Sequence, residues 1–373
     1  MIKMNIPFVD LKSQYKAIKV EIDTAIQTVI EETEFIGGRH VKEFEKNFCQ
    51  VYGVDHCISV ANGTDSLYII MKMLGIGEGD EIITAANSWI SSSETITQTG
   101  ARPVFVDIDP DYYSINEDLL EDAITPKTKA IIVVHLHGQM CEIEKILEIC
   151  RRHGIYLIED CAQSHFSEWK GKRAGTFGIA GSFSFYPGKN LGAYGDAGCI
   201  ITNDQELSIK CRMYARHGAL TKHKHEIEGI NSRMDGLQAS VLNVKLPHII
   251  KWTEARITNA QIYSSLLSGN SNICLPKVRP HSKHTFHLYV IRTKKRDELM
   301  EFLKSKGIET AIHYPTALPN LKAYQYLDYS ANDFPVASKY QSEILSLPMY
   351  PELNPEMIRY VADQINCFYD LHP

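Results

Sequence analysis

The sequence predicts an α/β protein with a large domain on a mostly parallel, doubly wound sheet and a smaller α+β domain at the C-terminus. The first observation is the alternation of short apolar strands with helices of about 10–15 residues, which begins at residue 56. The second is the apolar run KAIIVVHLHG at 129–138, which is typical of a parallel strand that is buried on both faces. The third is a long helical pattern over 235–269, which a shorter α+β pattern follows.

Two helices precede the alternating pattern. Apolar residues at helical spacing predict an amphipathic helix over 9–32 and a second helix over 40–52. In the alternating region, strands are expected at 57–60, 80–85, 103–109, 129–138 and 155–160, and the helices between them at 62–75, 91–100, 115–124 and 142–154.

The remaining elements complete the sheet and form the second domain. Strands are expected at 181–187 and 198–204, and one of them is a candidate for an antiparallel strand. The helix over 235–269 is expected to bend at Pro247, because proline cannot donate the backbone hydrogen bond of a helix. The C-terminal α+β pattern consists of a strand at 284–293 and helices at 295–307 and 355–369. We therefore place the two domains at 1–245 and 246–373.

Composition excludes several classes of function. The net charge of −6 gives no electrostatic attraction to nucleic acid or to an anionic membrane. No apolar run approaches the roughly 18–20 residues that span a bilayer, and the N-terminus lacks the features of a signal peptide. The 9 cysteines are scattered without a C-x-x-C pair, which indicates reduced thiols. We expect a cytoplasmic protein without a nucleic-acid or membrane partner.

Two groups of polar residues follow predicted strands, where open α/β sheets bind ligands. Gly63 and Thr64 start a helix, and their backbone N–H groups could bind an anion, although the same residues also suit an ordinary turn. Asp160 ends an apolar strand, and a buried carboxylate needs a partner such as a cationic ligand nitrogen. Gln163 could reach the same ligand or bond to the local turn.

A lysine follows a third strand. In SFSF the residues alternate, so Ser182 and Ser184 share one face, and the chain then turns through Pro187 and Gly188 to Lys189. The motif of a phosphate loop is G-x-x-x-x-G-K-[ST], whereas here Asn190 follows the lysine and the glycine spacing is wrong. The phosphate-loop interpretation therefore fails, which leaves a covalent lysine or a surface lysine.

An anion site, a carboxylate for a ring nitrogen, a hydroxyl and an amine are together what pyridoxal 5'-phosphate requires. With these residues the sequence resembles the DegT-type sugar aminotransferases, which are fold-type-I pyridoxal-phosphate enzymes that aminate keto-sugars carried on nucleotides. The resemblance covers nearly the whole chain, through IPFVDLKSQY, FIGGRHVKEFEKNF, VANGTDSL, GEGDEIITAANSWISSSETITQTGARPVFVDID, IEDCAQSH, SFSFYPGKNLGAYGDAG, NSRMDGLQASVLNVKL and HYP.

The resemblance implies a role for each residue of the cofactor site. Lys189 forms the Schiff base and moves a proton, Asp160 keeps the pyridine nitrogen protonated, and Gln163 hydrogen-bonds the phenolic oxygen. Trp89 stacks on the ring where relatives more often carry Phe or Tyr, and a core aromatic is the alternative for Trp89.

The resemblance also implies which residues bind the phosphate and the sugar. The phosphate is held by the Gly63 and Thr64 amides, the Ser184 hydroxyl, and Asn231 from the other subunit of a homodimer, so that the two sites are shared. The sugar is expected to contact Tyr186, Tyr194, His313 and Tyr314, with a packed loop as the alternative for His313 and Tyr314.

Two groups of histidines are weaker signals. His135 and His137 alternate along a strand, but no acidic or cysteine partner stands at ligand spacing in the sequence, so no metal site is expected. His217, His223 and His225 lie in a polar stretch that suits either a loop in contact with the nucleotide or a solvated loop.

The resemblance implies an aminotransferase with a ping-pong cycle. L-Glutamate would donate the amino group, and the acceptor would be a nucleotide-linked keto-deoxysugar, with a dTDP-3-keto-6-deoxyhexose favoured by the residues around Lys189. The pathway would make deoxyaminosugars, as for O-antigen or another surface polysaccharide. A 4-keto substrate is one alternative, and a non-catalytic pyridoxal-phosphate-binding regulatory protein is another. Sugar dehydration is disfavoured, because dehydrating relatives carry histidine where this chain keeps Lys189.

Overall fold

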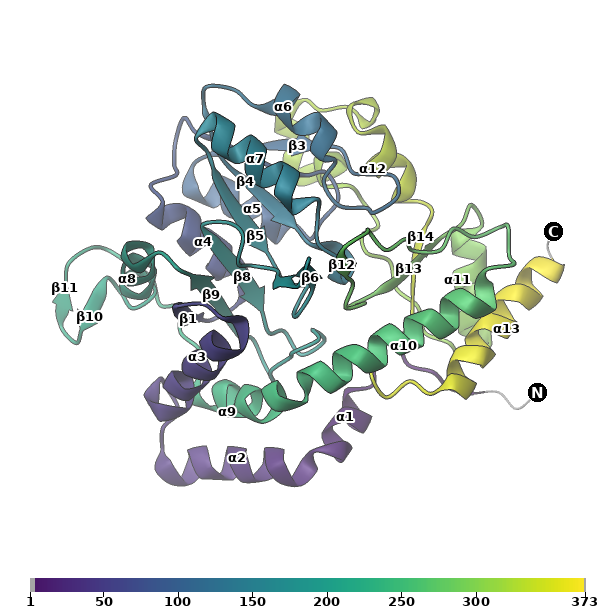
Figure 1. Ribbon diagram of the computed structural model, residues 1–373, viewed down its shortest axis with the longest axis horizontal. Helices are drawn as coiled ribbons and strands as arrows, with labels where there is room; N and C mark the ends of the chain where they lie inside the picture. The colour runs from purple at the N-terminus through teal and green to yellow at the C-terminus, as the bar shows by residue number, and fades with distance from the viewer. Residues whose placement is uncertain (1–3, 372–373) are drawn as a thin grey trace.

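A seven-stranded sheet forms the centre of the molecule (Figure 1). The computed structural model describes residues 4–371. The strand order is β1-β9-β8-β5-β4-β2-β3, and β9 runs antiparallel to both neighbours while the other pairs are parallel. The predicted mostly parallel sheet is confirmed, and β9 is the antiparallel strand. The bounds are β1 (His56–Val60), β2 (Glu81–Ala85), β3 (Arg102–Val106), β4 (Thr128–Val134), β5 (Tyr156–Asp160), β8 (Ala180–Ser184) and β9 (Gly198–Thr202).

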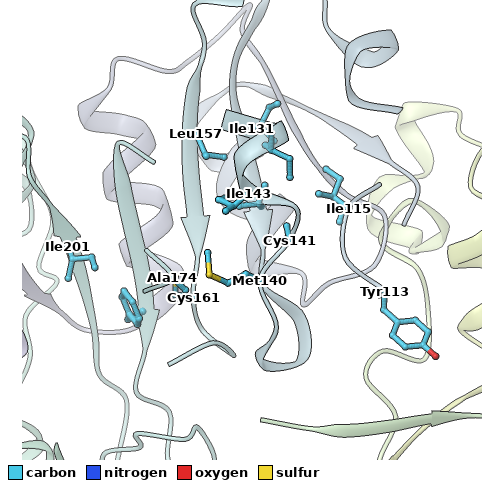
Figure 2. Packing of buried hydrophobic residues seen from close by; sticks show 14 of the residues in the cluster. Tyr113, Ile115, Ile131, Met140, Cys141, Ile143, Leu157, Cys161, Ala174 and Ile201 are labelled. Carbon is cyan, nitrogen blue, oxygen red and sulfur yellow. The ribbon is translucent and has the colours of Figure 1, made fainter. Parts of the chain in front are cut away.

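Helices cover both faces of this sheet. Helices α3 (Gly38–Tyr52) and α7 (Ile143–His153) share one buried cluster with the sheet, while α4 (Gly63–Met73), α5 (Ser91–Thr99) and α8 (Gln205–Tyr214) share another. Successive residues of a strand point to opposite faces, so both faces of the central strands must be apolar. Figure 2 shows one side of this arrangement, where Ile131 of β4 and Leu157 of β5 extend toward Ile143 of α7.

Strand β8 places different chemistry on its two faces. Phe183 and Phe185 pack against α3, with ring centroids 5.3 Å from Phe48 and Phe44 respectively. Ser182 and Ser184 point to the opposite face, where the Ser182 hydroxyl donates a hydrogen bond of 3.3 Å to the Gly63 carbonyl. The predicted alternation is confirmed. It puts the polar face of β8 next to the start of α4.

The N-terminal segment forms two helices where the sequence predicted one. Helix α1 (Leu11–Ala17) is followed by α2 (Lys19–Glu32), and Ile18 between them has a non-helical φ of −123° and ψ of 23°. This break allows Ile18 to pack beside Ile22 and against Val241. Burial of the apolar side chain at the break therefore overrides the continuous helical pattern.

The long C-terminal helix bends where the sequence predicted. Helix α9 (Gly236–Lys245) and helix α10 (Ile249–Leu267) are joined by the 3₁₀ turn η3 (Leu246–His248), which contains Pro247. In Figure 1 the green α10 runs from the sheet toward α11 (Arg296–Ser305) and α13 (Pro355–Leu371). These helices and the antiparallel pair of β13 (Tyr289–Arg292) with β14 (Ile344–Leu347) enclose a second hydrophobic core. The division of the chain at residue 245 stays a prediction.

Several short elements were not predicted. The residues expected as a helix at 115–124 form η1 (Glu117–Leu119) and α6 (Leu120–Ala123), and the strand expected at 284–293 begins only at Tyr289. The unpredicted elements are the strands β6 (Glu168–Trp169), β7 (Lys172–Arg173), β10 (Ala219–Thr221), β11 (Lys224–His225), β12 (Ser282–Lys283) and β14, the helices α8 and α12 (Pro335–Tyr340), and the 3₁₀ turns η2 (Leu136–Gly138), η4 (Leu318–Asn320), η5 (Lys322–Leu327) and η6 (Ala331–Asp333). A search of residues 4–371 for a helix of the length and apolarity needed to cross a bilayer finds none.

Candidate active site

The carboxyl edge of the sheet brings the predicted residues together. Asp160 is the last residue of β5 and Ser184 is the last residue of β8, which pairs with it. Gly63 starts α4 directly after β1. Parallel strands end at a common edge, so three segments that are distant in the sequence meet there. The start of α4 packs directly against the end of β8, because a Cβ atom on Gly63 would lie only 2.7 Å from the Cβ of Ser184.

The start of α4 forms an anion-binding geometry. The Asn62 side chain caps the helix by accepting a hydrogen bond of 2.8 Å from the Asp65 N–H. The N–H groups of Gly63 and Thr64 are in the first turn, where a helix offers no acceptor of its own, and they carry the positive end of the helix dipole. The Thr64 hydroxyl lies 2.7 Å from the Ser91 hydroxyl, which ties the cradle to α5.

Asp160 is a buried carboxylate with two hydrogen bonds. One oxygen accepts a bond of 3.0 Å from the Ala162 N–H, and the other accepts a bond of 3.1 Å from the Ser92 hydroxyl. Burial raises the pKa of Asp160, while the Ala162 bond, the Lys189 charge and the Ser92 bond act in the opposite direction. A cation beside this carboxylate would remove the cost of keeping it ionised.

Lys189 lies in the loop after β8 and is partly buried. Its backbone N–H donates a bond of 2.8 Å to the Tyr186 carbonyl, which holds the tight turn. Burial lowers the pKa of the Lys189 amine to about 8, and the charge of Asp160 opposes this shift. Near physiological pH most of the amine is still protonated, but the neutral fraction that a nucleophile or proton acceptor requires is far larger than for a lysine with the ordinary pKa.

Gln163 and Tyr314 are joined by a hydrogen bond. The Gln163 side-chain amide donates to the Tyr314 hydroxyl at 2.8 Å, while its Oε1 atom is buried without a hydrogen-bond partner among residues 4–371. Trp89 lies beside this pair, with its ring centroid 5.8 Å from that of Tyr314. The Trp89 side chain is 59% exposed, so the alternative of a core aromatic is wrong for this residue.

His313 is held on two sides. Its Nδ1 atom lies 2.9 Å from the Ser346 hydroxyl, and its ring stacks on Phe8 with a centroid distance of 5.7 Å. Burial and the nearby Lys189 charge lower the pKa of His313 to about 4. The imidazole is therefore neutral at physiological pH.

Tyr186 and Tyr194 differ in their surroundings. Tyr186 is 59% exposed, three residues before Lys189. Tyr194 has the Lys245 ammonium 4.3 Å from its ring centroid, and its ring lies 6.4 Å from that of Tyr15 in α1. Contact of either tyrosine with a sugar stays a prediction.

Asn231 lies beside the cradle of its own chain but is exposed. Its backbone pairs with Arg216, and the next residue, Ser232, donates a hydrogen bond to the Asp65 carboxylate. A cavity of about 460 Å³ lies at the same end of the molecule, between α3 and the β10–β11 hairpin. No acidic residue is found in its lining, whereas the basic and imidazole side chains are Lys42, Arg216, His217, Lys222, His223, His225 and Arg233.

The sequence places no acidic or cysteine residue at ligand spacing from His135, but the fold brings two such side chains close to its ring. Its ring lies within 4.8 Å of the donor atoms of Glu159 and Cys161. These groups are nevertheless used in hydrogen bonds. The Nδ1 atom of His135 accepts from the Cys141 N–H at 3.2 Å, and Nε2 lies 3.1 Å from Glu159. The Glu159 carboxylate also accepts three bonds of 2.7–2.8 Å from backbone N–H groups at 175, 177 and 178. The cluster is therefore an internal brace rather than an open metal site.

The sequence analysis missed several residues that surround Lys189. The Ser92 hydroxyl donates a hydrogen bond to Asp160 and lies 2.8 Å from the hydroxyl of Ser88. The serine-rich start of α5 is a signal in the sequence that could have indicated this contact. His165 is buried with neither ring nitrogen hydrogen-bonded within the described part of the chain, and burial and Lys189 lower its pKa to about 3. His287 binds Asn190 at 3.1 Å, and burial and Lys189 hold its pKa well below the usual value. No spacing in the sequence signals His287.

The residues fit pyridoxal phosphate. The cradle of Gly63, Thr64 and Ser184 suits its phosphate, and the buried carboxylate of Asp160 suits a protonated ring nitrogen. The unpaired Oε1 of buried Gln163 indicates a side chain placed to bind a further polar group. An amine with a lowered pKa is present within electrostatic reach of that carboxylate.

Comparison with known proteins shows similarity to one family of aminotransferases over nearly the whole chain. The sequence pattern of the DegT/DnrJ/EryC1/StrS aminotransferase family matches residues 16–366. A "pleiotropic regulatory protein" of Geobacillus stearothermophilus is 44% identical over 368 residues, which are 98% of this chain and 99% of that protein. The dTDP-3-amino-3,4,6-trideoxy-alpha-D-glucose transaminase of Streptomyces venezuelae is 38% identical over 357 residues, 95% of this chain and 94% of the relative.

A solved structure shares nearly the whole fold of this chain. The crystal structure of DesV from S. venezuelae, in complex with a ketimine intermediate, has a TM-score of 0.96 at 37% sequence identity. The alignment covers 98% of each chain.

Proposed function

The chain belongs to the DegT/DnrJ/EryC1/StrS aminotransferase family, and from this premise we propose that it transfers the amino group of L-glutamate to a nucleotide-linked keto-deoxysugar. It is an aminotransferase of the α/β fold that uses pyridoxal phosphate. One observation carries the proposal: Lys189, Asp160 and the start of α4 meet at the carboxyl edge of one sheet, with the pKa of the amine lowered to about 8. That placement brings an amine with a lowered pKa, a carboxylate and an anion site to one edge of the sheet.

The cofactor supplies a carbonyl that condenses with amines and a ring that withdraws electron density from the reacting carbon. The residues of this chain hold it in place. The amides of Gly63 and Thr64 and the Ser184 hydroxyl would bind its phosphate, while Asp160, oriented by Ser92, would bind the ring nitrogen as a charged pair. Gln163, held by Tyr314, would bind the phenolic oxygen, and Trp89, which lies beside Tyr314, would contact the ring.

Lys189 moves the proton that transamination requires. In each half-reaction a proton leaves one carbon and is added to another, and an amine with a pKa near the working pH both accepts and returns it efficiently. The neutral histidines around Lys189 assist, because a charged imidazole there would disfavour protonation of the amine. His165, His287 and His313 all have lowered pKa values.

The nucleotide end of the substrate is expected to need cations. The basic cavity under the β10–β11 hairpin has the chemistry of a diphosphate site, which supports the interpretation of the His217–His225 stretch as a contact to the nucleotide. Asn231 borders that end of the molecule, and we propose that it reaches the phosphate in the partner subunit of a homodimer.

The preferred acceptor is a dTDP-3-keto-6-deoxyhexose. Relatives carry names that specify dTDP-, UDP- and GDP-linked sugars, so family membership alone does not choose among them. The transaminases of 38% and 40% identity named for 3-amino dTDP sugars favour the 3-keto substrate. A 4-keto sugar is the alternative, because Lys189 and Asp160 act identically on either carbon.

A panel of 3-keto and 4-keto sugars on dTDP, UDP and GDP, each with L-glutamate, tests the substrate. The proposal predicts the highest kcat/KM with the dTDP-3-keto-6-deoxyhexose and an amino group on C3 by product NMR. An amino group on C4, or turnover with UDP-linked N-acetyl sugars alone, would contradict it.

The second candidate function is regulation without turnover, which the names of two relatives suggest. One absorbance measurement on the purified protein distinguishes regulation without turnover from transamination. An aminotransferase loaded with pyridoxal phosphate loses its yellow colour when L-glutamate is added, whereas a sensor without turnover keeps it.

A further inference from the structure

Lys245 is a buried cation without a carboxylate partner in contact with it. Only 1% of the residue is exposed, at the C-terminal end of α9. Among residues 4–371 no ion pair is formed with it, although the more distant charge of Glu352 raises its pKa slightly. Burial dominates and lowers the pKa of Lys245 to about 8. Fully buried lysines are rare because their desolvation is costly, so this one requires an explanation.

The hydrogen bond and the ring contact of the Lys245 ammonium both lie in one loop. Its ammonium donates a hydrogen bond of 2.8 Å to the carbonyl of Gly192 and lies 4.3 Å from the ring centroid of Tyr194. A charge-assisted bond to a buried carbonyl is stronger than a neutral one, and the aromatic ring adds a cation–π contact. Lys245 therefore holds two points of the segment that follows Lys189.

This segment, the Lys189 loop (residues 185–197), is closed on itself. Its ends are joined by the bond from the Phe185 N–H to the Ala197 carbonyl, and the Ala193 N–H donates to the Phe185 carbonyl, both at 2.8 Å. A Cβ atom on Gly192 would lie 2.3 Å from the Pro187 carbonyl oxygen. The Gly192 backbone therefore packs closely against the turn that carries Lys189. Because the two segments are in such close contact, we expect a displacement of Gly192 to move that turn.

Three other side-chain hydrogen bonds help to hold the loop, and none of the three is to Gly192. The Gln238 side chain, also on α9, accepts a hydrogen bond from the Tyr194 N–H at 2.9 Å. On the other side Asn190 binds the Thr285 carbonyl at 3.4 Å and His287 at 3.1 Å. From α9, Gln238 therefore bonds the loop at Tyr194, and Lys245 bonds it at Gly192.

We propose that Lys245 is a positioning residue for Lys189: through the Gly192 carbonyl and the Tyr194 ring it fixes the loop so that the Lys189 amine meets the cofactor carbonyl. This rests on the proposed role of Lys189 as the covalent lysine. Lys245 itself touches neither substrate nor cofactor in this account. The hydrogen bond to the Gly192 carbonyl and the contact with the Tyr194 ring offset part of the cost of burying its charge.

The test measures covalent attachment in the full-length protein. The cofactor is removed, pyridoxal phosphate is added back, and the Schiff base is trapped with borohydride at successive times and located by peptide mass spectrometry. Lys245→Met keeps the length and apolar stem but removes the ammonium. Lys251→Met, an exposed lysine on α10, is the matched control. The melting temperature of each variant and its dissociation constant for pyridoxal phosphate are measured in parallel.

The expected result is attachment at Lys189 that is about 10–100-fold slower in Lys245→Met, since a displacement of about 1 Å can cost that much. Cofactor affinity stays within about threefold, because the start of α4 is untouched. Lys251→Met matches the parent. If Lys245→Met does not fold, Lys245→Gln, which is too short to reach Gly192, replaces it with the same expectation.

The rate of labelling and the lysine that carries the label distinguish a failure of the positioning role of Lys245 from a failure of the proposed site. Attachment at Lys189 at the parental rate in the Lys245 variant would overturn the positioning role and leave the proposed site intact. Attachment at another lysine in the parent protein would overturn the proposed site itself.

Discussion

At the scale of single residues, the site depends on two ionisable groups whose burial acts against their charges. Burial raises the pKa of Asp160 and lowers that of Lys189, while their mutual attraction opposes both shifts. A cationic ring nitrogen beside Asp160 would take over part of that attraction. The residues that bind the cofactor are thus strained electrostatically without it, which is common at active sites.

Asp160→Asn tests the role of the carboxylate. The variant keeps the shape of the side chain but offers the ring nitrogen no negative charge, so we expect kcat to fall by about 10²-fold or more with a small change in melting temperature. Steady-state kinetics at saturating cofactor measure the effect, and Asp122→Asn, an exposed carboxylate, is the control. Near-parental turnover would mean that another acid holds the nitrogen.

Lys189→Met tests the cost of burying the amine in cofactor-free protein. The folded pKa of about 8 lies below the ordinary value of 10.5, so the protonated lysine destabilises the fold fully below pH 8. The penalty is relieved as pH rises from about 8 toward 10.5, where the folded state has lost a proton that the unfolded state keeps. We expect the variant to be more stable than the parent at pH 7, by roughly 2 kcal/mol after allowance for partial exposure.

Urea unfolding of both proteins at several pH values measures this difference. It should shrink steadily between pH 8 and 10. A difference that stays constant over that range would show that the pKa of Lys189 is not lowered.

At the scale of elements, the start of α4 and the end of β8 must approach closely. Gly63→Ala would place a Cβ atom 2.7 Å from that of Ser184, so one of the two segments must move. We expect cofactor affinity to fall at least tenfold and stability to fall by about 1–3 kcal/mol. Fluorescence titration of the cofactor-free protein measures the affinity.

Gly77→Ala provides a matched control, because the nearest atom to its Cβ would be 3.6 Å away, an ordinary contact. It should bind the cofactor as the parent does. Unchanged affinity in Gly63→Ala would mean that the phosphate lies elsewhere.

The elements of the sheet were predictable because their patterns are regular. The alternation of Ser182–Phe185 and the continuous run of β4 each follow from the faces that these strands bury. Turn chemistry at Gly63 and Pro187 marked the ligand edge. Family resemblance, rather than spacing, assigned the roles of Gln163, Asn231 and His313.

The other features of the fold and of the site depend on contacts between residues that are far apart in the chain, and a single sequence does not show which residues make such contacts. The break at Ile18 follows from its burial against α9, and the two-residue strands β6 and β7 are too short to show alternation. Ser92 and Lys245 matter because of what the fold places next to them, 68 and 53 positions away in the chain respectively.

At the scale of the whole molecule, the account requires two chains. Asn231 is exposed at one end of the molecule, next to the basic cavity, and the proposal places it in the partner's site. Mixing the inactive variants Lys189→Ala and Asn231→Ala should then restore activity, because half of the sites in a hybrid dimer are intact. The restored activity should approach about one quarter of the parental value after full subunit exchange.

Light scattering at the assay concentration is the companion measurement. A monomer, or a mixture that stays inactive although subunits exchange, would contradict the shared site. Lys189→Ala mixed with Asp160→Asn controls for exchange without complementation, since both residues lie in one chain's part of the site.

The central claim is that Lys189 is the lysine that bonds to pyridoxal phosphate, and its most direct test is borohydride reduction of the loaded protein followed by peptide mass spectrometry. The account predicts a phosphopyridoxyl group on Lys189 in near-stoichiometric yield, which is lost when L-glutamate is added before the reductant. A label on any other lysine, or bound cofactor that borohydride cannot attach to the chain, would contradict it.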